Sequence, residues 1–237
     1  SIGIGQDALG LGVLTGDHNI AFGNGAGYDL TSGTYNIFTG YQAGANVTTG
    51  AGNVFSGYQT GENATTANFS ISIGYSAIGV GVMTGTDNTA IGRQAGNDLT
   101  SGEYNNFMGY QAGYNATTGD SNIAIGREAI GLGVLTGTNN VVLGYQAGYD
   151  LTSGDHNILS GFQAGSNVTT GTGNIFQGNE AGEFATTASY GIAIGYEAIG
   201  LGIMTGTDNT AIGRIAGHDL TSGAFNNFIG YFAGANA

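Results

Sequence analysis

The stretch NTAIGRQAGNDLTSGEYNNFMGYQAGYNATTG, residues 88–119, states one pattern twice. An Asn begins each copy, and a three-residue run, a Gly, a Gln-Ala-Gly and a Thr-Ser-Gly or Thr-Thr-Gly follow at the same spacing. The pattern recurs along the whole chain, so repetition decides the fold class before any single residue does. Positions are numbered here from the residue that begins each unit.

We place fourteen unit starts. They are Ser1, Asn19, Asn36, Asn53, Ser70, Asn88, Asn105, Asn122, Asn140, Asn157, Asn174, Gly191, Asn209 and Asn226. Most units have 17 residues, whereas those starting at Ser1, Ser70, Asn122 and Gly191 have 18. The spacing of the longer units predicts a seven-unit module, residues 1–121, followed by a truncated second copy, residues 122–237; residues 85–93 recur unchanged at 206–214.

The composition excludes an ordinary globular domain. Among 237 residues there are 48 Gly and no Pro, Trp or Cys, while 41% are hydrophobic and 8% are charged. A period of 17 is too short for helix-pair repeats, and Gly at this density disfavours helices. The sequence therefore predicts an all-β fold: one continuous parallel β-solenoid or β-roll of about 14 coils.

Two strands are expected in each coil. The first covers positions 2 to 4, for example residues 123–125, and the second lies around residues 150–152, or 132–135 in a longer unit. Gly and Asn supply the corners between them, because both tolerate a positive φ.

The first strand carries apolar side chains on both faces. Positions 2 and 4 share one face and position 3 takes the other. Large apolar residues at position 3 indicate that this second face meets symmetry-related chains, which predicts a homo-oligomer. The candidate inter-chain face consists of Phe38, Phe55, Phe107, Val142, Leu159, Phe176 and Phe228.

The charge limits the partners. Sixteen acids against three Arg give a net charge of -13, which would repel nucleic acid and anionic lipid surfaces. No apolar run approaches the ~18 residues of a membrane span, so no membrane insertion is expected.

The Asn-x-Ala-Ile-Gly runs at residues 88–92, 122–126 and 209–213 resemble the head repeats of trimeric autotransporter adhesins, and the fuller form at 36–50 and 105–119 resembles phage tail-fibre arrays. The resemblance implies a homotrimer of left-handed parallel β-rolls. It also implies an extracellular place, on a virion tail fibre or a cell surface, and attachment to a host glycan or protein.

Catalytic residues are not expected, because a repeat rarely brings unlike groups together. The histidines His18, His156 and His218 lack a nucleophile motif, and no cofactor or metal site is predicted. The recurring Asp29, Asp98, Asp150 and Asp219 fit Asx-type corners better than a calcium column. Acid pairs for a tailspike-type depolymerase would have to come from Asp17, Asp87, Asp155, Asp208, Glu128, Glu180 or Glu197.

Two surface columns remain. Thr pairs such as Thr48-Thr49 raise ice binding as an alternative, although adjacent residues of a strand point in opposite directions. The corner tyrosines either stack as an aromatic ladder, with Arg93, Arg127 and Arg214 over their neighbours, or offer a contact surface. They are Tyr41, Tyr58, Tyr75, Tyr110, Tyr145, Tyr196 and Tyr231. The sequence thus favours a non-catalytic fibre or adhesin segment.

Overall fold

The computed structural model describes residues 1–10 and 13–236, and it divides the chain into two compact units, Ser1–Asp120 and Ser121–Ala237. Residues 11, 12 and 237, which belong to the predicted modules, lie outside the described residues. The described part contains fourteen three-residue strands and no helix, with one strand in each repeat unit. The prediction of an all-β parallel solenoid is confirmed within each unit.

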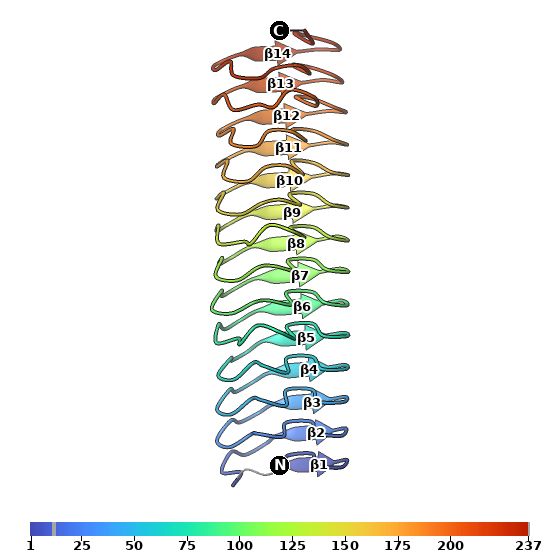
Figure 1. The fold of residues 1–237 in the computed structure, drawn as a ribbon, viewed down its shortest axis with the longest axis vertical. Helices are drawn as coiled ribbons and strands as arrows, with labels where there is room; N and C mark the ends of the chain where they lie inside the picture. Colours follow the sequence, from blue (N-terminus) through green and yellow to red (C-terminus); the bar gives the residue numbers. More distant parts are fainter. Residues whose placement is uncertain (11–12, 237) are drawn as a thin grey trace. The chain divides into compact units, whose positions relative to one another are not determined.

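The strands of the first unit pair in chain order, in parallel, with each residue opposite the equivalent residue of the next repeat. They are β1 (Ile2–Ile4), β2 (Ile20–Phe22), β3 (Ile37–Thr39), β4 (Val54–Ser56), β5 (Ile71–Ile73), β6 (Thr89–Ile91) and β7 (Asn106–Met108). Figure 1 shows these strands one above the next, with an irregular return path in each coil.

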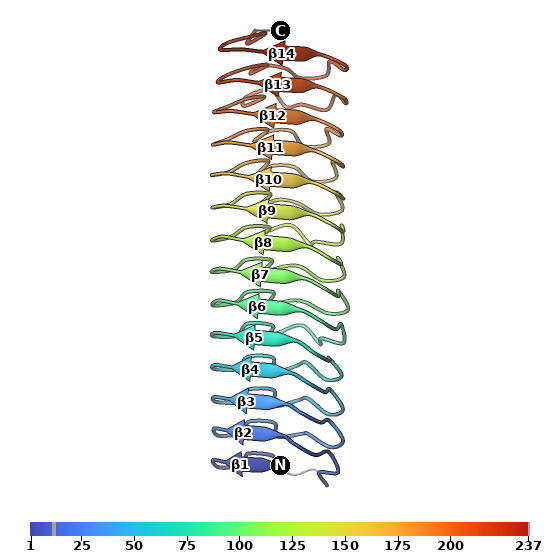
Figure 2. The same cartoon turned by 180° about the vertical axis from the view of Figure 1, so that it is seen from behind.

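The second unit repeats the arrangement in the same register. Its strands are β8 (Ile123–Ile125), β9 (Val141–Leu143), β10 (Ile158–Ser160), β11 (Ile175–Gln177), β12 (Ile192–Ile194), β13 (Thr210–Ile212) and β14 (Asn227–Ile229). The view from behind in Figure 2 shows the same single strand per coil.

The prediction of a second strand is wrong. Residues 132–135 and 150–152 form a turn end, bends and irregular structure. The amides of Leu132 and Gly133 both donate to the Tyr149 carbonyl, at 2.9 and 3.1 Å, and those of Thr136 and Gly137 share the Thr152 carbonyl. Because two successive amides use one acceptor, the alternating pattern of a strand ladder does not develop.

The position-3 side chains fill the interior of their own coil, which corrects their assignment to an inter-chain face. Phe38, Phe55, Phe107, Val142, Leu159 and Phe176 are 0% exposed, and Phe228, in the last coil, is partly exposed. The Phe38 and Phe55 rings stack with centroids 5.5 Å apart. Packing within a single chain is therefore sufficient to bury the position-3 side chains of all but the last coil.

The interior accommodates these rings because position 9 is Gly in the same coils. A Cβ on Gly44 would lie 2.7 Å from the Phe38 ring, so the ring occupies the space that a larger residue would need. The longer coils reverse the arrangement: Ser72 and Ala124 stand at position 3, and the buried Ile78 and Ile130 stand at position 9. Where both positions are small, as at Ala90 and Gly96, the Phe107 ring of the next coil lies 3.0 Å from a Cβ placed on Gly96, so neighbouring coils also share the interior volume.

The Asn at position 1 forms a buried hydrogen-bonded ladder. The Asn36 side chain donates to Asn19 Oδ1 at 3.0 Å and to the Gly50 carbonyl at 2.8 Å, and its own Oδ1 accepts from the Asn53 backbone at 3.0 Å. Ser70 and Gly191 interrupt the ladder at equivalent places in the two units. Among the described residues no buried side-chain nitrogen or oxygen lacks a partner, as stable burial of amides requires.

A Gly at position 5 ends each strand. Gly57 has φ +143°, a conformation that L side chains rarely adopt, and a Cβ there would overlap the Gly74 carbonyl oxygen of the next coil. The close stacking of coils therefore requires glycine at this corner.

Candidate functional site

The outer strand face is the principal apolar surface of each unit. It consists of the first and third residues of each strand, which point away from the filled interior. Its exposed large side chains are Ile2, Ile4, Ile20, Phe22, Ile37, Ile71, Ile73 and Met108 in the first unit, and Ile125, Ile158, Ile175 and Ile229 in the second.

In the part of the chain that the structure describes, no charged residue stands on the outer strand face, although the net charge is -13. Its polar members are Thr, Ser, Asn and Gln. Parallel sheets are ordinarily covered on both faces, and contiguous exposed apolar patches mark interaction sites. The face therefore has the composition of a surface that another molecule covers.

The corner tyrosines form a stacked column beside the strands. In the first unit, Tyr58 stacks between Tyr41 and Tyr75, with centroids 5.0 and 5.1 Å away. The Arg93 guanidinium then lies 5.7 Å from the rings of both Tyr75 and Tyr110. Stacked rings and cation–π contacts of this kind stabilise neighbouring coils.

The second unit builds the same column with different members. Tyr145 stacks on Phe162 at 5.2 Å and receives Arg127 at 5.5 Å. Arg214 lies 5.3 Å from the Tyr196 ring and 5.6 Å from the Tyr231 ring, and donates to the Tyr231 hydroxyl at 3.2 Å. The stacked rings agree with the ladder, one of the two arrangements that the sequence left open, and the arginines lie over neighbouring tyrosines as expected.

The Thr pairs divide their hydroxyls between two environments. Thr48 Oγ1 donates to the Thr65 carbonyl of the next coil at 3.1 Å, and Thr31 Oγ1 donates to the Thr48 carbonyl at 3.0 Å. The second residue of the pair, Thr49, is exposed. In the Thr48-Thr49 pair, one hydroxyl therefore bonds the next coil and the other faces solvent.

The recurring aspartates stay apart from one another. Asp98 and Asp150 are partly buried, and this burial raises the pKa of each carboxyl above its ordinary value. Glu183 has a raised pKa as well, caused by burial and then by the negative charges of Glu180 and Glu197. Within the described residues, no three His, Cys, Asp or Glu side chains converge as metal ligands do.

The histidines have separate surroundings. His18 stacks on Tyr35 at 4.8 Å. In the second unit, His218 places Nδ1 2.8 Å from Asp219 and Nε2 3.5 Å from Glu197. The hydrogen bond and negative charge of Glu197 raise the pKa of the neighbouring Tyr196.

None of the described segments is a helix of the length and apolarity that crossing a bilayer requires. No protein-family model, curated protein or solved structure matches this chain.

Proposed function

We propose that this chain is a non-catalytic segment of a homotrimeric extracellular fibre, on a virion tail or a bacterial surface, that projects or presents an attachment site. The observation that carries the proposal is the outer strand face, an exposed and uncharged apolar surface that runs over the strands of a unit.

A second copy of the chain is the occupant that fits this face best. Its apolar side chains recur once per coil, in the register of the strand ladder. A partner that contacts every strand must have the same coil spacing, and an identical chain has it by construction. The absence of charge on the face also lets chains of net charge -13 meet there without placing acids opposite acids.

Repetition also favours a structural role. Each coil is stabilised mainly by its neighbours, through the Asn ladder, the stacked tyrosines and the strand ladder. This construction extends a fixed surface by adding coils. Three copies are the assembly of the adhesin heads that the repeats resemble.

The test is the molar mass in solution, measured by light scattering and sedimentation. We expect a trimer for the wild-type chain and a monomer for Ile71→Lys/Ile73→Lys, because two charges on the face would be buried without partners. Val80→Lys/Val82→Lys is the matched control: both valines are exposed aliphatic residues of the same unit, outside the face. A monomeric wild-type chain, or equal loss of assembly in the control, would contradict the proposal.

A further inference from the structure

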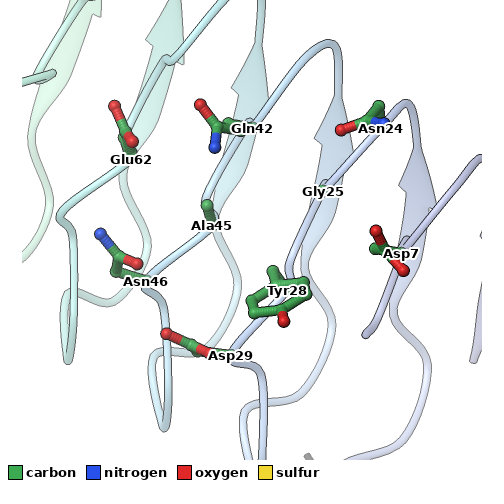
Figure 3. A pocket seen from close by; sticks show the side chains of 9 residues that line it. All are labelled: Asp7, Asn24, Gly25, Tyr28, Asp29, Gln42, Ala45, Asn46 and Glu62. Atoms are coloured by element: carbon green, nitrogen blue, oxygen red, sulfur yellow. The ribbon is translucent and has the colours of Figure 1, made fainter. Parts of the chain in front are cut away.

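The first unit contains a polar surface groove of about 380 Å³ that the tyrosine column and the outer strand face do not include (Figure 3). Four successive coils contribute to it. Its lining residues are Asp7, Asn24, Gly25, Tyr28, Asp29, Gln42, Ala45, Asn46 and Glu62. This volume lies within the ~300–1,000 Å³ typical of small-molecule sites.

The groove exists where two side-chain columns end. Position 7 is Gln in most short coils, and these glutamines bond from coil to coil, as Gln59 does to Gln42 at 3.2 Å. Both columns stop short of the second coil, where Asn24 and Gly25 stand in place of the tyrosine and the glutamine. This replacement leaves open space beside the Tyr28 ring.

The second unit shows the same site filled. Five lining residues are identical there, and Asp7 is replaced by Glu128. Asn24, Gly25 and Ala45 are replaced by the larger Tyr145, Gln146 and Ser166. Gln146 donates to Glu128 at 2.8 Å and accepts from Gln163 at 3.2 Å, so it takes the hydrogen bonds that a ligand would otherwise use.

Several polar groups of the groove have hydrogen-bonding capacity left for a ligand. Within residues 1–10 and 13–236, the carboxylates of Asp7 and Asp29 accept no hydrogen bond from the protein. The Asn46 amide donates to Asn63 at 2.6 Å, which leaves its Oδ1 free to accept. Figure 3 shows the Gln42 amide nitrogen on the side of Ala45, and Gln42 Oε1 is already engaged by Gln59.

The Tyr28 ring is held in place at the groove. It lies against Gly10, where any Cβ would overlap the ring. The ring is half-buried, with part of its surface toward solvent. A fixed aromatic surface next to planar carboxylates and amides suits a ligand with one apolar face and a polar rim.

Hydrogen-bond acceptors outnumber donors in this lining, and no cationic side chain is present. Asp7, Asp29 and Glu62 repel an anionic ligand, and burial raises the pKa of Glu62, against the opposing hydrogen bond from Gln59. The matching ligand supplies many O–H donors and no negative charge. We propose that this groove binds a neutral saccharide of one or two rings.

The inference deepens the attachment role proposed above and rests on it for its biological use. One weak site per chain would gain avidity when several copies present it together.

The test is titration calorimetry with glucose, galactose, mannose, N-acetylglucosamine and lactose, with sialyllactose and Ca²⁺ alone as comparators. We expect at least one neutral saccharide to bind in the millimolar range, and neither comparator to bind at this site. Asn24→Tyr/Gly25→Gln gives positions 24 and 25 the side chains of the second unit and should weaken binding at least tenfold. Ser76→Gln, which adds a glutamine to the same column outside the groove, should leave binding unchanged.

The reverse variant, Tyr145→Asn/Gln146→Gly/Ser166→Ala, opens the equivalent site and should raise the stoichiometry from one to two per chain. Circular dichroism verifies that each variant is folded. Absence of binding by all five neutral sugars, binding of Ca²⁺ alone, or equal binding by the filled variant would overturn the saccharide site. A trimer that binds no sugar leaves the proposed fibre intact, whereas a sugar-binding monomer contradicts the fibre and supports the site.

Discussion

Alternate residues of the same short strands lie in opposite environments. In β5, Ser72 is 0% exposed, whereas Ile71 and Ile73 on either side are 38% and 39% exposed. The inner face is filled by positions 3 and 9 of the same and neighbouring coils, whereas the side chains of the outer face remain partly exposed. The difference separates two roles: the inner residues determine whether a coil forms, and the outer residues determine what the coil meets.

The largest effect is expected from emptying the interior. Phe55→Ala removes a fully buried ring that stacks on Phe38 and should lower the free energy of unfolding by about 3–5 kcal/mol. Denaturant unfolding followed by circular dichroism measures the loss. Restoring volume from the facing position is the control, since Phe55→Ala/Gly61→Ile copies the Ala124 and Ile130 pairing of a longer coil. A loss below about 1 kcal/mol in the single variant would contradict a closely packed interior.

The buried Asn ladder should come next. Asn53→Ala removes the acceptor of the Ser70 amide and the donor to the Ala67 carbonyl, leaving both groups buried without partners. We expect a cost of about 2–4 kcal/mol by the same unfolding measurement. Asn53→Ser should cost less, because Ser70 already stands at this position and its Oγ accepts from the Asn88 amide at 3.2 Å. Equal costs for the two variants would show that the hydrogen bonds do not act as described.

A change on the outer face should affect the chain itself much less. Ile71→Thr introduces a residue that already occupies the equivalent position at Thr89 and Thr210. The chain below its assembly concentration should lose at most about 1 kcal/mol, because Ile71 is only partly buried there. Unfolding of dilute protein measures this loss, and a cost similar to that of Phe55→Ala would contradict the distinction between the faces.

The smallest effect concerns a polar corner. Burial raises the pKa of Asp98 above its ordinary value of 3.8, so the charged form destabilises the fold at neutral pH. Asp98→Asn should therefore stabilise the chain by less than about 1 kcal/mol, since solvent screens this partly exposed group.

The pH dependence fixes the sign of that effect. As pH falls through the raised pKa toward 3.8, the folded chain binds the proton more readily than the unfolded chain, and the advantage of Asp98→Asn should disappear. Asp17→Asn, at an exposed acid, controls for the change in net charge. If the stability difference between Asp98→Asn and the wild-type chain grew as pH falls, the proposed effect of Asp98 burial would be contradicted.

The period of 17 was sufficient to predict one coil per repeat, the strand at positions 2 to 4 and the tyrosine column, because each depends on regular spacing. The prediction was wrong about which face of the strand points into the coil, because both faces carry apolar residues and the pattern alone does not distinguish them. The deciding signal was the exchange between positions 3 and 9: Phe38 occurs with Gly44, and Ser72 occurs with Ile78. This exchange holds in most coils, and in coils such as that of Ala90 and Gly96 the ring of the next coil takes the space instead.

The groove could not be predicted from the period, because it arises where the repeat is broken. In the sequence, Asn24 and Gly25 are ordinary variants of the repeat. Their effect appears only in the stacked coils, where they leave a gap next to Tyr41 and Gln42. The second strand failed for a different reason: return segments share acceptors even between two 17-residue coils, as the amides of Thr152 and Gly154 do when both donate to the Thr169 carbonyl, at 3.0 and 3.3 Å.

Single-cysteine labelling of β5 tests the central claim most directly, because the chain contains no natural cysteine. In dilute protein, Ile71→Cys and Ile73→Cys should react rapidly with a thiol reagent and become protected as the concentration rises and copies cover the outer face. Ser72→Cys should stay unreactive at every concentration until denaturant opens the coil. Rapid labelling of Ser72→Cys in the folded chain would contradict the account, because position 3 would then not be the interior.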